Sequence, residues 1–257
     1  MTGIRALFFS DLHLGFRFSR SAAFLEMLRQ YDMQYLYIVG DGLDGWRLSR
    51  KWHWPPLYNE IVDHVLELAD RGVEVRYTPG NHDEFLREPN PAIEGIEIED
   101  EFFHETADGR RMLITHGDLF DSVEKRFHRT SRLGSRIYDS FMWTNSVTNQ
   151  VLARMGLGEF NYSFAIKRWS KRLVGAVGSV QSLVIEHARQ MNCDGVVCGH
   201  FHRPEIVADD GFAYCNTGDW VEHQSMILEQ EDGTLQLFDR DRLLGEVPPQ
   251  TARSAEG

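Results

Sequence analysis

Side chains that bind metal ions recur in this sequence as short motifs, each placed just after an apolar stretch. The motifs are D-x-H at Asp11 and His13, G-D at Asp41, G-N-H-D from Gly80 to Asp83, H-G-D from His116, and G-H-x-H at His200 and His202. In an extended segment, side chains two positions apart point the same way, as two ligands of one metal ion must. Taken singly, each motif is also explained as a polar turn, because Asn, Asp and Gly are common turn residues.

The apolar stretches before the motifs predict β-strands that would bring them together. Alternating, β-branched and aromatic residues predict strands over about 4–9, 35–39, 73–77, 111–115 and 194–198. In α/β sheets, ligands bind outside the carboxyl ends of the strands. Five motifs that follow five strands therefore indicate one shared site rather than five unrelated turns.

The candidate ligands combine oxygen and nitrogen atoms and include no thiolate. They are Asp11, His13, Asp41, Asn81, His116, His200 and His202. This mixture suits Mn²⁺, Fe or Zn²⁺ better than Mg²⁺ or Ca²⁺, which prefer oxygen alone. Seven ligands exceed the needs of one tetrahedral ion. They fit two ions roughly 3.5–4 Å apart that share a carboxylate, the arrangement that stabilises both the attacking and the leaving oxygen of a phosphoryl displacement.

Further elements surround these strands. Helical periodicity predicts helices over about 21–31, 59–71 (with Asn59 as N-cap) and 179–191. Two more strands are predicted over about 211–216 and 224–229, and Asp-Gly pairs predict hairpin turns at Asp108 and Asp232. Residues 216–220 could line the site, although a capped turn is the better interpretation. We expect a single domain over 1–245 and a disordered tail over 246–257.

Two segments could contact a substrate. Between Trp46 and Tyr58, basic and aromatic residues such as Arg47, Arg50 and Trp52 could hold a phosphate and stack on a base, or could only seal the edge of the sheet. The segment 121–178 contains ten Lys/Arg and four Asp/Glu, which gives it a net charge of +6. Since the whole chain carries −12, the remainder carries −18. This helical, basic and apolar insertion could pack as a lid or meet an anionic amphiphile or a membrane surface.

Composition narrows the class of protein. Hydrophobic content of 42% and charged content of 26% are typical of a soluble globular protein. A net charge of −12 argues against a nucleic-acid partner bound through a broad basic surface. The three cysteines lack metal-cage spacing and indicate a reducing compartment. Without a signal peptide or a long apolar run, we expect a cytoplasmic protein that could still attach to a membrane surface.

In this order, the five motifs resemble those of the calcineurin-like metallophosphoesterase superfamily, over Asp11 to His202. The resemblance implies an α/β fold, a four-layer α/β/β/α sandwich, with a helical lid. It implies two metal sites, made by Asp11, His13, Asp41 and His202, and by Asp41, Asn81, His116 and His200. By the same resemblance, His82 would be the catalytic residue that is not a ligand, aiding protonation of the leaving group or binding the phosphate.

Within the superfamily, the short chain and the insertion after His116 resemble the UDP-2,3-diacylglucosamine pyrophosphatases of lipid A synthesis. These enzymes release UMP and a diacylglucosamine 1-phosphate, use Mn²⁺ and act peripherally at the inner membrane. The subfamily typically carries Arg where this chain has His82, which marks a divergent branch. A general nucleotide-sugar or phosphodiester hydrolase is the alternative, and the complete ligand set argues against a non-enzymatic scaffold. Candidate substrate contacts are Arg47, Arg50, Trp52, Lys167, Arg168 and Lys171.

Overall fold

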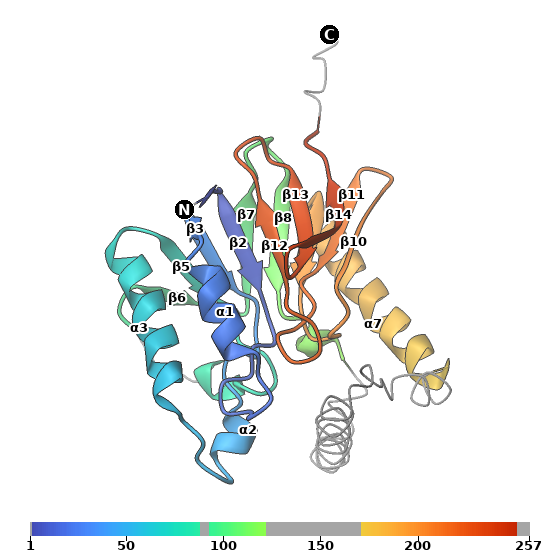
Figure 1. Cartoon of the computed structure of the whole chain (residues 1–257). Coiled ribbons are helices and arrows are strands. Elements are labelled where there is room, and N and C mark those ends of the chain that lie inside the picture. The colour runs from blue at the N-terminus through green and yellow to red at the C-terminus, as the bar shows by residue number, and fades with distance from the viewer. Residues whose placement is uncertain (1, 88–92, 122–170, 251–257) are drawn as a thin grey trace, which may run out of the picture. The chain divides into compact units, whose positions relative to one another are not determined.

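The chain forms two β-sheets that pack face to face. A computed structural model describes residues 2–87, 93–121 and 171–250 (Figure 1). The seven-stranded sheet has the order β14 (Arg242–Val247), β13 (Leu235–Asp239), β12 (Ser225–Glu229), β2 (Ala6–Phe9), β4 (Tyr35–Ile38), β5 (Glu74–Tyr77) and β6 (Ile96–Ile98). The five-stranded sheet has the order β10 (Glu205–Asp209), β11 (Phe212–Asn216), β9 (Gly195–Cys198), β8 (Arg111–Thr115) and β7 (Glu101–Glu105).

The central strands of each sheet run parallel, which places their carboxyl ends at one edge. In the larger sheet, β2, β4, β5 and β6 pair in parallel, and β12 joins β2 in the antiparallel sense. In the smaller sheet, β8, β9 and β11 pair in parallel and are flanked by antiparallel β7 and β10. A short pair, β1 (Thr2–Gly3) and β3 (Tyr31–Asp32), lies beside them.

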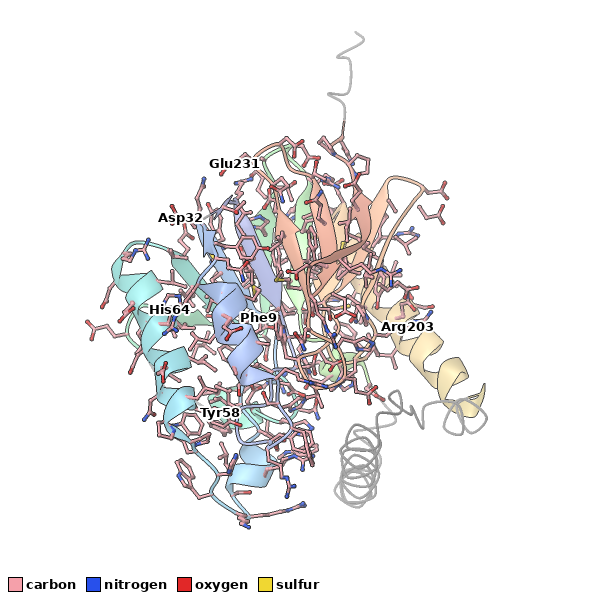
Figure 2. All side chains as sticks on the ribbon, in the orientation of Figure 1. Phe9, Asp32, Tyr58, His64, Arg203 and Glu231 are labelled. Carbon is pink, nitrogen blue, oxygen red and sulfur yellow. The ribbon has the colours of Figure 1, made fainter. Side chains whose placement is uncertain are left out.

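Alternation along β2 shows why both faces of the larger sheet are buried. Leu7 and Phe9 point into a core shared with α1 (Ser21–Leu28) and α3 (Pro56–Asp70). Ala6 and Phe8 point the other way, into the core between the two sheets. Figure 2 labels Phe9 on β2 and Tyr58 on α3, two members of the first core. A strand buried on both faces needs a continuous apolar run, which is what this strand has.

The layer order is α/β/β/α, as predicted. Helices α1 and α3 cover the outer face of the seven-stranded sheet (Figure 1). The outer face of the five-stranded sheet meets the last turns of α7 (Lys171–Gln190): His187 pairs with Glu101 of β7 at 2.8 Å, and Arg189 lies over the ring of Phe212 of β11. Elsewhere in the described residues, three short helices occur: α2 (Gly45–Leu48), η1 (Glu84–Arg87) and η2 (Asp118–Phe120).

Several predicted boundaries were wrong. The helix predicted over 21–31 ends at Leu28, because Tyr31 and Asp32 pair with β1 instead. Asn59 does not cap the next helix, which begins at Pro56, a residue whose fixed φ suits the first helical position. Instead, the Asn59 side chain accepts a hydrogen bond from Trp54 Nε1 at 2.8 Å.

Three further corrections concern the second half of the chain. Helix α7 begins at Lys171, eight residues before the predicted start at 179. Strand β10 was not predicted, because it is an exposed edge strand without a clear apolar alternation. Of the expected tail over 246–257, Glu246 and Val247 belong to β14, and 251–257 lie outside the described residues.

The chain divides into two compact units, one formed by Met1–Asp118 with Val184–Gly257 and the other by Leu119–Leu183. Most of the predicted lid over 121–178 lies outside the described residues, so the lid and the single domain over 1–245 stay predictions. Among the helices in the described part of the chain, each is too short or too polar to cross a bilayer.

Candidate metal centre

All five motifs directly follow the strands that were predicted to carry them. Asp11 and His13 follow β2, Asp41 follows β4, Asn81 and His82 follow β5, His116 follows β8, and His200 and His202 follow β9. The first three strands belong to one sheet and the last two to the other. Both sheets therefore supply side chains to the same place.

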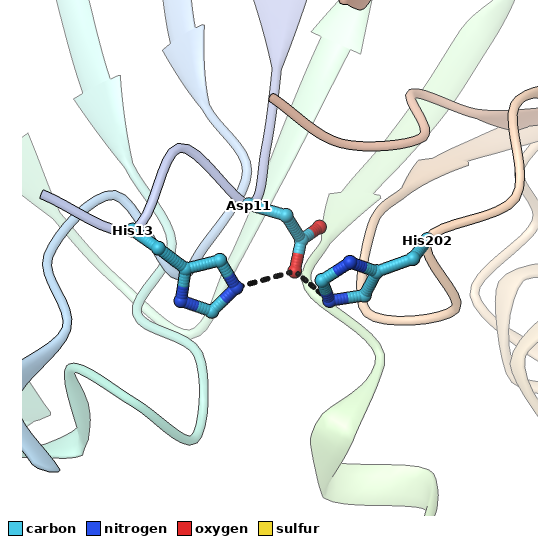
Figure 3. Close-up of side chains that lie close together, drawn as sticks. All are labelled: Asp11, His13 and His202. Carbon is cyan, nitrogen blue, oxygen red and sulfur yellow. Dashed lines mark ion pairs between the residues drawn. The ribbon is translucent and has the colours of Figure 1, made fainter. Parts of the chain in front are cut away.

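The carboxylate of Asp11 lies between two imidazoles (Figure 3). Its Oδ1 is 3.1 Å from His202 Nε2 and 3.7 Å from His13 Nε2. One ligand atom from each of these residues lies within 4.8 Å of the others, close enough for a single cation to be held by all three. All three side chains were predicted to bind the same ion.

Asp41 is the residue that the remaining groups share. Its Oδ2 lies 3.5 Å from His116 Nε2 and 3.9 Å from His13 Nε2. Asp41 with Asp11 and His116 forms one group that could hold a cation, and Asp41 with His13 and His82 forms another. Asp11 and Asp41 each belong to two of the three groups, and a carboxylate common to two adjacent groups can bridge two ions. The family resemblance implies that role for Asp41, and the role stays a prediction.

Asn81 and His200 lie beside this cluster. The ring of His200 is 5.3 Å from that of His116, and its backbone N–H donates to Asp11 Oδ2 at 3.1 Å. Asn81 directly precedes His82, whose backbone N–H donates to Asp41 Oδ1 at 2.8 Å. The structure thus brings all seven predicted ligands to one region.

His116 shows that the donor set suits a metal ion. Its Nδ1–H donates to the backbone carbonyl of Val39 at 2.7 Å, which leaves Nε2 as the nitrogen with the free lone pair. Within the described residues, this buried Nε2 has no hydrogen-bond partner. A metal-binding histidine is usually held in this way, with its second nitrogen bonded to a carbonyl or carboxylate.

The electrostatics of the cluster favour positive charge at its centre. Burial alone would raise the pKa of Asp41, but the imidazoles of His116 and His82 lower it well below its usual range. Burial would lower the pKa of His202, but the Asp11 carboxylate raises it to about 10. Two carboxylates that hold protons on their neighbours so firmly would hold divalent cations there by the same attraction.

Sequence reasoning missed Asp44, which holds His82 in place. His82 Nδ1 donates to Asp44 Oδ1 at 3.1 Å, and Asp44 Oδ2 accepts from Arg47 Nε at 2.6 Å. Burial opposes protonation of His82, but Asp41 and the hydrogen bond with Asp44 raise its pKa. The ring of Trp46 packs against His82 at 4.1 Å between centroids. The second carboxylate in G-D-x-x-D was the available signal.

Hydrogen bonds from residues outside the ligand set hold Asp11 and the G-N-H-D turn in place. Ser10 Oγ donates to the Asp11 carboxylate and pairs with Thr217 Oγ1 at 2.6 Å. Asp83 accepts hydrogen bonds from the backbone N–H of Gly80 at 2.6 Å and from the hydroxyl of Tyr77. Asp83 is therefore an anchor of the turn.

Residues 216–220 form a capped turn, which was the preferred interpretation of this segment. The Asp219 carboxylate accepts from the backbone N–H groups of Val221 and His223 at 2.7 and 3.2 Å. The backbone N–H of Trp220 donates to the carbonyl of Asp11 at 3.1 Å. This turn therefore braces the backbone of one candidate ligand.

The predicted substrate contacts are placed less uniformly than the ligands. The guanidinium of Arg47 is bonded to Asp44 and lies 3.8 Å above the ring of Phe16. Arg50 is exposed, and Trp52, 71% exposed, stacks on Trp54. Lys167 and Arg168 lie outside the described residues, and Lys171 begins α7. Their substrate roles stay predictions.

Residues 4–204 match the family described as calcineurin-like phosphoesterases. Among curated proteins, the chain is 25% identical over 235 residues to the UDP-2,3-diacylglucosamine hydrolase of Shewanella piezotolerans, covering 89% of this chain and 95% of that protein. It is 26% identical over 245 residues to the enzyme of the same name from Photorhabdus laumondii, covering 90% and 97%.

A solved structure supports the fold. The phosphoesterase Yfce from E. coli superimposes with a TM-score of 0.50 at 17% identity, covering 95% of this chain and 99% of that chain. At this identity the likeness concerns the fold alone. It agrees with the α/β/β/α layer order described above.

Proposed function

We propose, from the premise that this chain belongs to the calcineurin-like phosphoesterase family, that it is a two-metal hydrolase of a nucleotide-linked lipid. Membership makes the chain a phosphoester hydrolase. The substrate we propose is UDP-2,3-diacylglucosamine, cleaved to UMP and 2,3-diacylglucosamine 1-phosphate. The two-metal part rests on one observation: the Asp41 carboxylate belongs to two adjacent groups of candidate ligands, one with His13 and the other with Asp11 and His116.

In this proposal each ion takes ligands from both sheets. One ion would be held by Asp11, His13, Asp41 and His202, and the other by Asp41, Asn81, His116 and His200. Mn²⁺ is our first choice of ion, since these are carboxylate, amide and imidazole donors, and Fe or Zn²⁺ would also fit. When bound, such ions polarise a phosphoryl oxygen and activate water for attack.

His82 is the protein group that we assign to proton transfer or phosphate binding. Its Nδ1–H is bonded to Asp44, so its Nε2 is the nitrogen that can serve the substrate. The ring of Trp46 packs on the imidazole, and Arg47, whose side chain is only 21% exposed, forms an ion pair with Asp44. Both contacts limit the movement of His82 and Asp44. A positioned imidazole of this kind can protonate the leaving phosphate oxygen or donate a hydrogen bond to it.

The lipid part of the proposal rests on two observations. The curated relatives named above carry the name UDP-2,3-diacylglucosamine hydrolase and align over nearly the whole chain. The segment 121–178 combines a charge of +6 with apolar residues at helical spacing. A UDP-linked diacyl sugar presents two negative phosphates and two acyl chains, which this combination would suit. Contact with the cytoplasmic face of a membrane would follow from the same segment.

Loss of the shared carboxylate tests the two-metal part. We expect the purified protein to hydrolyse bis(p-nitrophenyl) phosphate, with Mn²⁺ restoring activity to the metal-stripped enzyme. Asp41→Ala should abolish this activity, because it removes a ligand from both ions. Asp63→Asn, an exposed carboxylate on α3, is the control that should leave activity unchanged. Near-normal turnover of Asp41→Ala at saturating Mn²⁺ would exclude the shared-ligand arrangement.

A pair of substrates tests the lipid part. Each buried methylene is worth about 0.8 kcal/mol, so acyl chains can dominate affinity. UDP-2,3-diacylglucosamine should be cleaved at least ~100-fold more efficiently than UDP-N-acetylglucosamine, a difference of about 2.7 kcal/mol in transition-state stabilisation. Equal kcat/KM values would instead favour the second candidate, a general nucleotide-sugar or phosphodiester hydrolase. His82, at a position where the lipid-specific subfamily typically carries Arg, is the observation that favours this candidate.

A further inference from the structure

We infer that Arg87 is a positioning residue that ties together the two loops carrying Asn81 and His116. The inference rests on the proposed metal centre, because it assigns Arg87 a role in preparing the second ion's site. Arg87 ends η1, directly after the G-N-H-D turn, and it belongs to none of the five motifs. Its side chain donates to Pro79, Asp100 and Asp118, none of which is a candidate ligand.

One guanidinium bonds both loops at once. Arg87 Nη1 and Nη2 donate to the two carboxylate oxygens of Asp118, each at 2.9 Å. Nη2 also donates to the backbone carbonyl of Pro79 at 2.5 Å. Pro79 stands two residues before Asn81, and Asp118 stands two residues after His116. A single planar group therefore links the two loops.

A third bond fixes the orientation of that group. Arg87 Nε donates to Asp100 Oδ1 at 2.8 Å, in the connection between β6 and β7. The Arg87 side chain is 21% exposed and that of Asp118 is 7% exposed, so water competes little for their two parallel hydrogen bonds. Lysine carries one point charge and cannot reproduce this fork.

The loops have no room to shift without disturbing the ligands. A Cβ placed on Gly80 would lie 2.3 Å from Asp41 Oδ1 and 2.6 Å from His116 Nε2. The backbone between Pro79 and Asn81 therefore packs directly on two candidate ligands. If the bonds to Arg87 were lost, movement of this backbone would change the distance between Asn81 and His116.

Exchange and metal binding together test the inference. We would compare wild type with Arg87→Met by hydrogen–deuterium exchange of the metal-free proteins and by calorimetric titration with Mn²⁺. Amides of 78–83 and 116–118 should exchange about tenfold faster in the variant. One of the two Mn²⁺ ions should bind about 10–100-fold more weakly, the usual effect of losing an outer partner of a ligand, while the other keeps its affinity.

Arg76→Met is the matched control. Arg76 also sits between two carboxylates, Glu74 and Glu97, and its side chain is 22% exposed, but neither of these ion-pair partners lies in a ligand loop. It should lower stability without selective exchange at 78–83 and without loss of Mn²⁺ affinity. Asp118→Asn keeps the Arg87 contact with Pro79, so it should weaken the binding of the same Mn²⁺ ion by a smaller factor. It replaces Arg87→Met in the experiment if that variant does not fold.

The possible outcomes separate this inference from the proposed function. Wild type that binds no Mn²⁺ would overturn the metal centre itself. Wild type that binds two ions, with Arg87→Met and Asp118→Asn binding both equally well, would overturn the positioning role alone. Faster exchange spread evenly over the whole chain in Arg87→Met, as in the control, would also overturn it, because that is the result expected of a merely stabilising ion pair.

Discussion

Five of the candidate ligands share an uncommon backbone conformation. Their φ angles are positive: 54° at Asp11, 50° at His13, 52° at Asp41, 69° at His200 and 50° at His202. Residues with a Cβ rarely adopt this left-handed region, and each such residue costs about 1–3 kcal/mol. Backbone bonds such as those from Asp11 N–H to Gly40 and from His13 N–H to Asp41 hold it in place. The conformation turns side chains at the strand ends toward one another.

At the same scale, a substitution of His82 can distinguish a role in proton transfer from a role in metal binding. His82→Gln keeps a polar side chain but removes the group that can donate a proton at neutral pH. We expect kcat to fall about 10²–10⁴-fold, the usual contribution of a general acid. Both ions should remain bound, because His82 is not among the ligands we assign. Kinetics with bis(p-nitrophenyl) phosphate and metal analysis of the same samples would measure the two effects.

Asp44→Asn supplies the comparison for that experiment. It should reduce kcat less than His82→Gln does, because it only loosens the orientation of the imidazole. If His82→Gln lost one equivalent of metal, His82 would be a ligand, an arrangement that its place near His13 and Asp41 also permits.

Residue types in the sequence were sufficient to predict the candidate ligands, but not the side chains that hold those ligands and His82 in place. Metal ions demand particular donors, so Asp, His and Asn at strand ends could be recognised in the sequence. Asp44 could not be assigned the same way, because a carboxylate is equally suited to cap a helix, and it also caps α2 through Arg47 N–H. The bond from the Arg47 guanidinium to that carboxylate was likewise not foreseen, and the substrate contact of Arg47 stays a prediction. Side-chain partners depend on folding geometry that residue spacing does not encode.

At the scale of elements, close approach between a loop and a ligand gives a direct prediction. Gly80 has an ordinary φ, so Gly80→Ala should act only through the space its Cβ takes, 2.3 Å from Asp41 Oδ1. Overpacking of this kind typically costs about 1–3 kcal/mol, and here it should displace a shared ligand. We expect at least ~10-fold weaker Mn²⁺ binding by calorimetry. Gly3→Ala, with nothing within 4 Å of its Cβ, should bind Mn²⁺ normally.

The turn after β11 should make stability depend on pH. The hydrogen bond from His223 Nδ1 to Asp219 Oδ2, at 2.6 Å, raises the pKa of His223 above 6.5 despite partial burial. Its stabilising effect is complete below pH 6.5 and is lost as pH rises through the raised pKa. Burial alone would raise the pKa of Asp219, but the hydrogen bond to His223, the charges of His202 and His223 and a backbone hydrogen bond together lower it to about 2, so Asp219 stays ionised throughout this range.

Denaturation of the metal-free protein at pH 6 and pH 9 checks this. The midpoint of wild type should fall more between the two values than that of His223→Asn. A variant whose pH dependence matched that of wild type would show that the pair contributes nothing to stability. Measuring both proteins with chelator present keeps metal binding, which is itself pH-dependent, out of the comparison.

Elements were predictable where one periodicity dominated. Strand β8 was predicted with its observed bounds, since a short apolar run and the Asp108-Gly109 turn before it agree. The start of α3 was not predicted, because Asn59 is a good N-cap by residue type while Pro56 is equally suited to the first helical position by its fixed φ. Strand β10 carries no pattern of its own and exists because β11 offers it a partner. Pairing between strands therefore decided where β10 forms.

At the scale of the whole molecule, charge is divided unevenly along the chain. The segment 121–178 carries +6 while the rest carries −18. The acidic part contains the candidate ligands, which attract cations, and the basic segment suits an anionic substrate. The amphipathic pattern predicted helices over that segment, but periodicity tells which face is apolar and not what covers it. Identifying what covers the apolar face therefore requires the binding and kinetic measurements proposed above.

Because the candidate ligands come from both sheets, metal binding should stabilise the whole fold. Asp11 and Asp41 follow strands of one sheet, and His116 and His202 follow strands of the other. An ion bound only by the folded state at 100 times its Kd adds about 2.7 kcal/mol. For a chain of this size that corresponds to a rise in Tm of about 5–10 °C per ion.

Thermal denaturation of the stripped protein with and without Mn²⁺ measures this rise. Asp63→Asn should show the wild-type rise, and Asp41→Ala should show a much smaller one, because the shared ligand is missing from both sites. His82→Gln should also keep the full rise, since in our assignment it binds no metal. A wild-type Tm that did not respond to Mn²⁺, at concentrations where activity is restored, would mean that the ions do not bind the folded chain in preference to the unfolded one. A site assembled from five strand ends, which only the folded chain brings together, would then be excluded.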